Sequence, residues 1–340
     1  MTRHRGAIIG LGGIATQSHL PAFRRPELAD HFEIIAAVDP VRAREGIVDG
    51  LPVYSETSRL LAEHDIDFVD IATPSASHVA LCRWALEHDL HVLCEKPVAV
   101  RRDDAIALAD LSRDRDCVLM PCHQYRANSV WRRIRDWLGD DAIGRWHLCE
   151  IAVYRSQADR GTSADALPWR VRKQDAGGGI LLDHGTHLLY TMLDIGGMPN
   201  AVSSWTATLA HQAYEVEDTA QIRLEFADRA ATLFLTWAAR HRETRVRIVG
   251  DGGSINWIDG ALTLERGGSA ETMDCSRELD KQSYSGWFAS LFACFSDTLD
   301  SGASSAAAEF ARKDVIRVAT ILEAAYHSAE VAASVTLARA

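Results

Sequence analysis

One stretch of this chain has residue types suited to proton transfer. Asp183 and His187 follow a run of three glycines and are four positions apart, which places both side chains on one face of a helix. An imidazole accepts a proton from an alcohol near neutral pH, and a nearby carboxylate can orient it or hold a substrate hydroxyl. Gly185 between them costs about 1 kcal/mol relative to alanine, which indicates a close approach there.

Two other interpretations of this stretch stay open. Asp183, His184 and His187 could bind a metal ion, but the two histidines lie on different helical faces and no further spaced ligands join them. The Asp–His pair could also be a structural cap at a helix start. We expect no metal.

A second stretch, Glu95-Lys96-Pro97, follows the apolar run His91–Cys94. A lysine at the carboxyl end of a strand can hydrogen-bond a substrate oxygen. The isolated tripeptide also fits a solvated turn, so its position in a sheet decides between the two interpretations.

A third stretch reads Gly10-x-Gly12-x-x-Ala15 between a short apolar run and a helix predicted over Gly13–Phe23. Gly10 would supply a tight turn, Gly12 would admit a pyrophosphate, and Ala15 would keep helix and strand close. The helix start, with Gly13 and Ile14, would face the anion. A glycine-rich turn without a ligand is the alternative.

Asp39 closes the next predicted strand, Glu33–Val38. A carboxylate there hydrogen-bonds ribose hydroxyls and repels a 2′-phosphate, so we infer NAD over NADP. Arg42 and Arg44 weaken this preference, and Asp39 could instead be a turn former before Pro40.

These stretches need an α/β framework. Short strands alternate with helices up to residue 123, which predicts a doubly wound parallel sheet of the Rossmann type. Ligands bind beyond the carboxyl ends of such strands. One rim therefore collects 10–13, Asp39, Thr73–Ser75 and 95–97.

The second half has a different pattern. From Trp146, longer alternating strands without intervening helices predict a large, mostly antiparallel open sheet with one wet face. Helices expected over 285–299 and 306–333 would return to pack near the first domain. We predict a dinucleotide-binding domain at 1–123 and an α+β substrate-binding and oligomerisation domain at 124–340.

Composition limits the function. The 340 residues suit two domains, and 36 Lys and Arg against 47 Asp and Glu give a net charge of −11, which disfavours nucleic acid and anionic membranes. Seven scattered cysteines indicate reduced thiols. No apolar run approaches the ~20 residues of a membrane span, and the start leaves no room for a signal peptide, so we expect a cytoplasmic protein.

The ordered set of motifs resembles the Gfo/Idh/MocA family of nicotinamide-dependent sugar and polyol oxidoreductases. The residues that carry the resemblance are Gly10-x-Gly12-x-x-Ala15 with Ser18–Phe23, Asp70–Pro74 with His78, Cys94–Pro97, Gly178-Gly179-x-x-x-Asp183-x-Gly185-x-His187, and Glu217–Ala220. The resemblance spans nearly the whole chain and implies a homodimer or homotetramer.

The resemblance also implies roles. Lys96 and His187 would be the catalytic pair, and Asp183 would grip a substrate hydroxyl. Thr73, Pro74, His78 and Glu95 would line the nucleotide, and a cis bond would precede Pro97. Further substrate contacts would come from Tyr125, Arg126, Trp169, Arg170 and His184.

We therefore predict an NAD-dependent dehydrogenase that oxidises a secondary hydroxyl of a sugar, glycoside or polyol to a ketone. The extra segment Asp159–Trp169 could form a wall for a glycoside, and the acidic charge is compatible with the glucosyl 3-hydroxyl of a cationic aminoglycoside in antibiotic biosynthesis. The alternatives are a 3-ketosugar or inositol-type reductase that uses the same residues, and a non-catalytic NAD-sensing protein.

Overall fold

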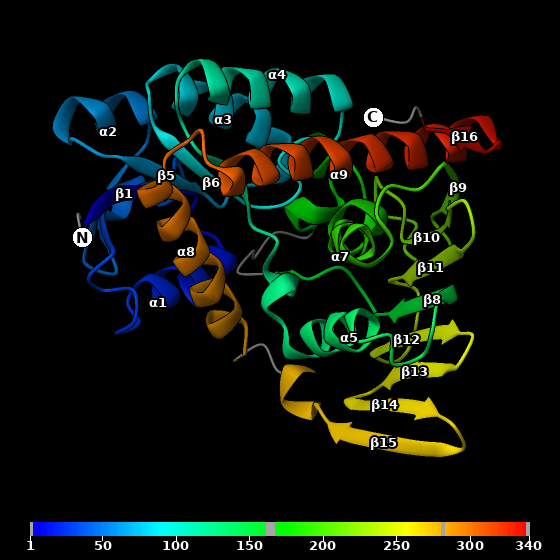
Figure 1. Ribbon diagram of the computed structural model, residues 1–340. Helices are drawn as coiled ribbons and strands as arrows, with labels where there is room; N and C mark the ends of the chain where they lie inside the picture. Colours follow the sequence, from blue (N-terminus) through cyan, green and yellow to red (C-terminus); the bar gives the residue numbers. More distant parts are fainter. Residues whose placement is uncertain (1–2, 161–166, 280–282, 338–340) are drawn as a thin grey trace. The chain divides into compact units, whose positions relative to one another are not determined.

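The computed structural model describes residues 3–160, 167–279 and 283–337, and these form two compact units (Figure 1). Unit 1 holds the described residues up to Gln124 together with 284–319. Unit 2 holds the remainder, beginning at Tyr125 and ending with the residues after Ala319. The chain therefore crosses between the units more than once.

Unit 1 is built on a seven-stranded sheet of order β3-β4-β2-β1-β5-β6-β7. Every pairing is parallel except β3 with β4. The strands are β1 (His4–Ile9), β2 (Phe32–Val38), β3 (Ile47–Val48), β4 (Leu51–Tyr54), β5 (Phe68–Ile71), β6 (His91–Cys94) and β7 (Leu119–Pro121). The predicted Rossmann-type sheet is confirmed, and strand order reverses between β1 and β5, where such sheets bind ligands.

Helices cover both faces of this sheet. The helices α2 (Thr57–Glu63), α3 (His78–Glu87) and α4 (Arg102–Asp114) lie over one face (Figure 1). The other face is covered by α1 (Leu20–Phe23), which continues the π-helical turn η1 (Ala15–His19), and by α8 (Tyr284–Ser301). Apolar side chains therefore point both ways along the strands, as in Phe68 and Val69.

Unit 2 is built on a nine-stranded sheet of order β15-β14-β13-β12-β8-β11-β10-β9-β16. Only β8 with β11 is parallel among its pairings, so the predicted mostly antiparallel sheet is confirmed. The strands are β8 (Trp146–Tyr154), β9 (Ala201–Ala207), β10 (Thr219–Glu225), β11 (Ala230–Thr236), β12 (Glu243–Gly250), β13 (Gly253–Ile258), β14 (Ala261–Arg266), β15 (Ser269–Asp274) and β16 (Val335–Thr336).

One face of this sheet is covered and the other is open. The helices α5 (Ser129–Gly139) and α7 (Thr186–Gly196) pack on the covered face, where Trp131 meets Trp257 edge-on with ring centroids 6.2 Å apart. On the open face, Leu148 and Trp205 remain 52% and 49% exposed. The short helix α6 (Lys173–Ala176) precedes the glycine run, and α9 (Ala306–Val331) begins in unit 1 and ends in unit 2.

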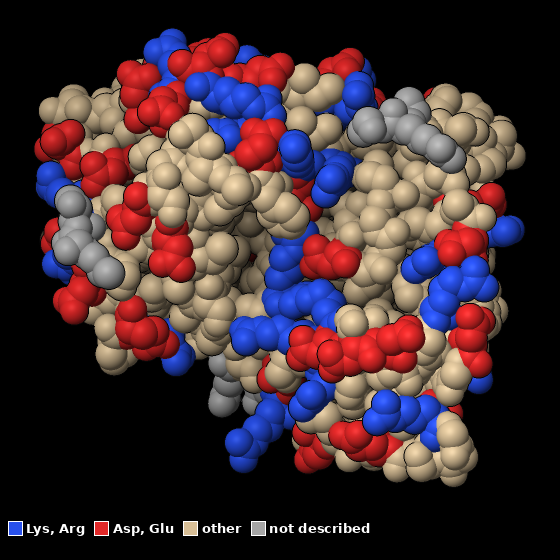
Figure 2. Space-filling model, in the orientation of Figure 1, with Lys and Arg blue, Asp and Glu red and all other residues tan. Residues whose placement is uncertain are grey.

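The described surface is of mixed charge. Acidic and basic side chains are interspersed on the face in Figure 2, so the net charge of −11 is not gathered there into one patch. Cys294 is exposed and the other cysteines are buried. Within the described residues, no helix combines the length and apolarity needed to cross a bilayer.

We predict that Phe292→Ala destabilises unit 1 by about 3–5 kcal/mol, because it empties a fully buried site in which the Phe292 ring stacks 4.2 Å from that of Phe23. Calorimetric unfolding measures the loss. Leu209→Ala, at a side chain 57% exposed, is the control and should change stability by less than about 0.5 kcal/mol. Equal effects of the two substitutions would contradict the core position of α8.

Candidate active-site residues

The glycine-rich turn after β1 fits a dinucleotide. Gly10 has a φ of +93°, and a Cβ there would lie 2.8 Å from the backbone oxygen of Ala72, so glycine lets the ends of β1 and β5 approach. A Cβ on Gly12 would meet no described atom within 4 Å. Protein packing therefore does not require glycine at residue 12, whereas a pyrophosphate close to the backbone would. Gly13 and Ile14 follow, partly exposed, at the helix start.

Asp39 both forms a turn and holds the glycine loop. Its Oδ1 accepts the backbone N–H groups of Val41 and Arg42, and its Oδ2 accepts that of Leu11 at 2.9 Å. A carboxylate has about four acceptor positions, so capacity for a ribose hydroxyl remains. The Arg42 guanidinium binds Glu45 through two hydrogen bonds of 3.0 Å.

His78 joins two loops at the rim. Its buried ring places Nδ1 2.8 Å from the carbonyl oxygen of Pro97 and Nε2 2.9 Å from that of Thr73. Burial lowers the pKa of His78. The Thr73 hydroxyl bonds that of Ser77, which donates to the Pro74 carbonyl. The lowered pKa keeps the ring neutral, so its single N–H donates to one of the two carbonyls while the ring lies between the loop after β5 and the loop after β6, where the Lys96–Pro97 bond is cis.

Beneath this rim lies a buried ion chain. Asp70 Oδ2 is 2.8 Å from His19 Nδ1, and Glu95 Oε1 is 3.1 Å from His19 Nε2. Burial lowers the pKa of His19, but the two carboxylates outweigh it and raise that pKa to about 10. The second Glu95 oxygen accepts the backbone N–H of Lys96 at 3.0 Å. The chain thus connects the helix after the glycine turn to the backbone of Lys96, whose side chain is partly exposed.

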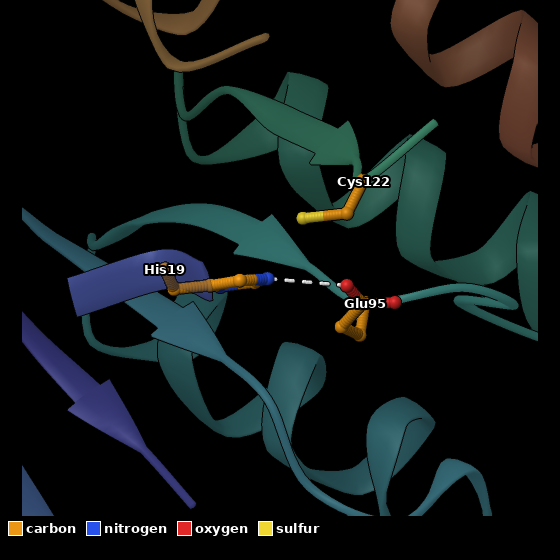
Figure 3. Close-up of side chains that lie close together, drawn as sticks. All are labelled: His19, Glu95 and Cys122. Atoms are coloured by element: carbon orange, nitrogen blue, oxygen red, sulfur yellow. Dashed lines mark hydrogen bonds and ion pairs between the residues drawn. The ribbon is translucent and has the colours of Figure 1, made fainter. Parts of the chain in front are cut away.

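Three side chains at this place, His19, Glu95 and Cys122, could converge on a metal ion (Figure 3). Their ligand atoms lie within 4.8 Å of one another. A metal needs an imidazole lone pair and a thiolate. Both nitrogens of His19 face carboxylates, and burial raises the pKa of the Cys122 thiol well above its ordinary value. The cluster is therefore a protonated ion chain beside a thiol, and we assign no metal to it.

In unit 2, His187 lies within an aromatic cluster. The ring of Tyr125 stacks on it at 4.2 Å with an interplanar angle of 9°. His187 Nδ1 lies 2.9 Å from the hydroxyl of Tyr190, which is fully buried. Arg126 follows Tyr125, and its guanidinium binds Asp194 and lies 5.5 Å over the Tyr190 ring.

Asp183 and His184 belong to a second group on the turn before α7. This turn, Leu181–Gly185, is π-helical, a wide turn that often occurs at functional sites. Asp183 Oδ2 lies 3.4 Å from His184 Nδ1 and 3.9 Å from Nε of Arg170. The Arg170 guanidinium covers the Trp169 ring at 4.5 Å. Of the predicted wall Asp159–Trp169, residues 161–166 lie outside the described part of the chain.

Three glycines around this turn, Gly178, Gly179 and Gly185, allow close packing against neighbouring segments. A Cβ on Gly185 would lie 3.2 Å from Leu235 of β11, so the expected close approach is made by the sheet. A Cβ on Gly178 would overlap the Tyr326 hydroxyl, and one on Gly179 would overlap the backbone oxygen of Glu217.

Glu217 holds the start of this helical segment, a role that the sequence did not reveal. Its carboxylate accepts the Tyr326 hydroxyl at 2.9 Å and the Leu181 N–H at 3.3 Å, while its backbone oxygen accepts the Ile180 N–H. Burial raises the pKa of Glu217. Its neighbour Asp218 accepts three N–H groups from Leu209, Ala210 and His211. The motif 217–220 alone carried no spacing signal for these contacts.

Comparison with protein families identifies both halves. Residues 4–123 match the model described as oxidoreductase family, NAD-binding Rossmann fold, and residues 131–256 match the GFO/IDH/MocA C-terminal domain. The chain belongs to the GFO/IDH/MocA oxidoreductase family. Its first unit is an NAD-binding Rossmann domain, and the predicted resemblance is confirmed.

The chain is also similar in sequence to individual oxidoreductases. The chain is 30% identical over 282 residues to a putative UDP-kanosamine synthase oxidoreductase subunit of Amycolatopsis mediterranei, covering 75% of this chain and 74% of that protein. It is 30% identical over 158 residues to levoglucosan dehydrogenase of Pseudarthrobacter phenanthrenivorans, a match that spans 44% of this chain and 39% of that enzyme.

A solved structure shares the fold over nearly the whole length. It is an oxidoreductase from Agrobacterium radiobacter in complex with NAD+, L-tartaric acid and magnesium. The TM-score is 0.85, with 23% identity and 98% of both chains covered.

We predict that the buried ion chain makes stability depend on alkaline pH. The pKa of His19 is raised from 6.5 to about 10, so its contribution is complete below pH 6.5 and is lost as the pH rises through about 10. The stability difference between wild type and His19→Asn, measured by urea unfolding, should narrow from pH 7 to pH 10. The difference for Phe292→Ala, which removes no titrating group, should stay constant. A stability difference between wild type and His19→Asn that does not change with pH would contradict a charged His19.

Proposed function

We propose that this protein is an NAD-dependent dehydrogenase that oxidises a secondary hydroxyl of a sugar, glycoside or polyol to a ketone. The observation that carries the proposal is the buried imidazole of His187, held through Nδ1 on α7 directly after the π-helical turn that carries Asp183, in a chain with an NAD-binding Rossmann domain. An imidazole held through one nitrogen is suited to accept a proton at the other.

The residues have separate roles in this proposal. His187 takes the proton of the substrate hydroxyl, Asp183 holds a neighbouring hydroxyl, and Lys96 is a hydrogen-bond donor to the substrate. NAD, when bound, supplies the hydride acceptor. The N–H groups from Gly12 to Ile14 face its pyrophosphate, and Asp39 binds its adenosine ribose.

Four rim residues complete the cofactor site in this proposal. Thr73, Pro74, His78 and Glu95 shape the two loops beside the nucleotide, because His78 bridges these loops and Glu95 holds the Lys96 backbone.

The substrate is proposed to be a neutral sugar. A carboxylate beside aromatic faces suits a polyhydroxylated ring. Asp183 is connected to the aromatic Trp169 by Arg170, whose guanidinium contacts both side chains. One relative, levoglucosan dehydrogenase, is named for a neutral sugar, which supports this class. The net charge of −11 is also compatible with a cationic aminoglycoside, and the guanidinium groups near the proposed site are paired, that of Arg126 with Asp194 and that of Arg170 with Asp183. Aminoglycosides are therefore one arm of the test.

We also propose that the protein forms a homodimer or homotetramer through the open face of its large sheet. The exposed Leu148, Trp205 and Ile258 support this, because half-exposed apolar side chains on an uncovered sheet are typical of an interface.

The experiment that tests the proposed activity is spectroscopic detection of NADH formation with a panel of inositols, free aldoses, uncharged glycosides, nucleotide sugars and aminoglycosides. NAD and NADP are compared in parallel. We expect turnover with NAD and a neutral sugar. Activity with ketosugars and NADH alone would assign the reverse reaction, and NADH binding without turnover in either direction would favour a sensor.

We predict that His187→Ala lowers kcat by about 10²–10⁴-fold, the usual contribution of a general base, while NADH affinity stays within twofold. Steady-state kinetics and NADH fluorescence titration measure the two quantities. His211→Ala is a matched control, because His211 lies in unit 2 on backbone carbonyls of Ser156 and Trp237. Turnover that survives in His187→Ala would remove His187 from the role of base.

A further inference from the structure

The hydroxyl of Tyr190 contacts both His187 and Tyr125 in unit 2. It lies 2.9 Å from Nδ1 of His187, three residues before it on the same face of α7. It also accepts the backbone N–H of Tyr125 at 3.0 Å. The Tyr190 side chain is 0% exposed and that of His187 8% exposed, so these bonds form away from bulk solvent.

The contacts at this hydroxyl relate directly to the tautomer of His187. A phenol oxygen has one proton and two lone pairs, and the N–H of Tyr125 occupies one lone pair. His187 Nδ1 either donates its own N–H to the second lone pair or accepts the phenol proton. The first arrangement leaves Nε2 without a proton, and the second places a proton on Nε2. Only an unprotonated Nε2 can accept a proton from a substrate alcohol.

We propose that Tyr190 is the positioning residue for His187: its oxygen accepts the Nδ1–H, which fixes the tautomer whose Nε2 acts as the base. This inference rests on the proposed function, because it assigns the orienting partner of the proposed base. The orienting partner is then a neutral phenol, and Asp183 is left to hold substrate.

The Tyr125 ring complements this bond. It stacks on the imidazole at 4.2 Å and 9°, which restricts rotation of the ring out of its plane. The same residue supplies the N–H that fixes the Tyr190 oxygen. One segment at the beginning of unit 2 therefore sets both the plane and the partner of the imidazole.

Other charged or titratable groups surround the cluster in unit 2. Arg126 lies over the Tyr190 ring, Asp194 binds Arg126, and Asp183 and His184 lie on the turn before α7. Tyr190→Phe keeps all of these side chains and the aromatic ring. A change in pH dependence in this variant therefore reports the loss of one hydroxyl.

The test is the pH profile of kcat/KM for Tyr190→Phe. An Nδ1–H bond to the phenol oxygen is stronger from the charged imidazolium than from the neutral ring, so its loss disfavours protonation. We expect kcat to fall about tenfold, KM to change less, and the acid limb to move to lower pH. If the phenol instead donates to Nδ1, the bond exists only with the neutral ring, and the limb moves to higher pH.

A control variant separates this role from general destabilisation. Tyr54→Phe removes another buried hydroxyl, bonded to Glu63 and His64 in unit 1, and should change stability without moving the acid limb. Thermal unfolding and NADH titration accompany each variant to verify folding.

The outcomes are distinguishable. The inference is overturned if, in a folded Tyr190→Phe that binds NADH, the acid limb moves to higher pH or does not move. The proposed function still stands in that case, provided that His187→Ala is inactive. Full turnover in His187→Ala overturns the proposed function and the inference with it.

Discussion

The cofactor half of the molecule depends on one buried charge arrangement, the imidazolium of His19 between Asp70 and Glu95. These three side chains come from the helix after the glycine turn, from β5 and from the end of β6. A buried charge is tolerated only when it is paired and hydrogen-bonded, so the elements that supply the partners cannot move independently. The same arrangement also holds Lys96 at the rim in place, because Glu95 accepts a hydrogen bond from its backbone N–H.

Unit 2 uses two acidic side chains in a related way, but their partners are mainly backbone N–H groups. Glu217 binds the first turn of the segment that carries Asp183 and His187, and Asp218 binds the turn at 209–211. An acid at a helix start satisfies donors that the helix itself leaves open. Glu217, just before β10, therefore fixes the candidate active-site helix to the sheet.

Much of the framework follows from local pattern. Buried parallel strands leave continuous apolar runs and one-sided antiparallel strands alternate, so the main strands of both sheets could be predicted. The strand β15 could not be predicted because its sequence, Ser-Ala-Glu-Thr-Met-Asp, has no apolar face. The hydrogen-bond partners of side chains could not be predicted for another reason. His19 belongs to a recognised motif, Ser18–Phe23, but neither the motif nor the position of Tyr190 reveals the side-chain partners. Those partners are residues that only the fold brings near, and the π-helical turns at 15–19 and 181–185 leave no simple periodic signal.

The return of the chain at residues 284–319 has a consequence for how such proteins can be recombined. The aromatic side chains of α8 cover Phe32 and Phe68 on one face of the Rossmann sheet. A gene fragment that ends after residue 124 would encode every strand of that sheet but would leave Phe32 and Phe68 without their contacts to α8. The NAD-binding unit therefore cannot be transferred to another protein as its N-terminal residues alone. Exchange between relatives must carry two separate pieces of sequence, and the second of them ends inside the uninterrupted helix α9.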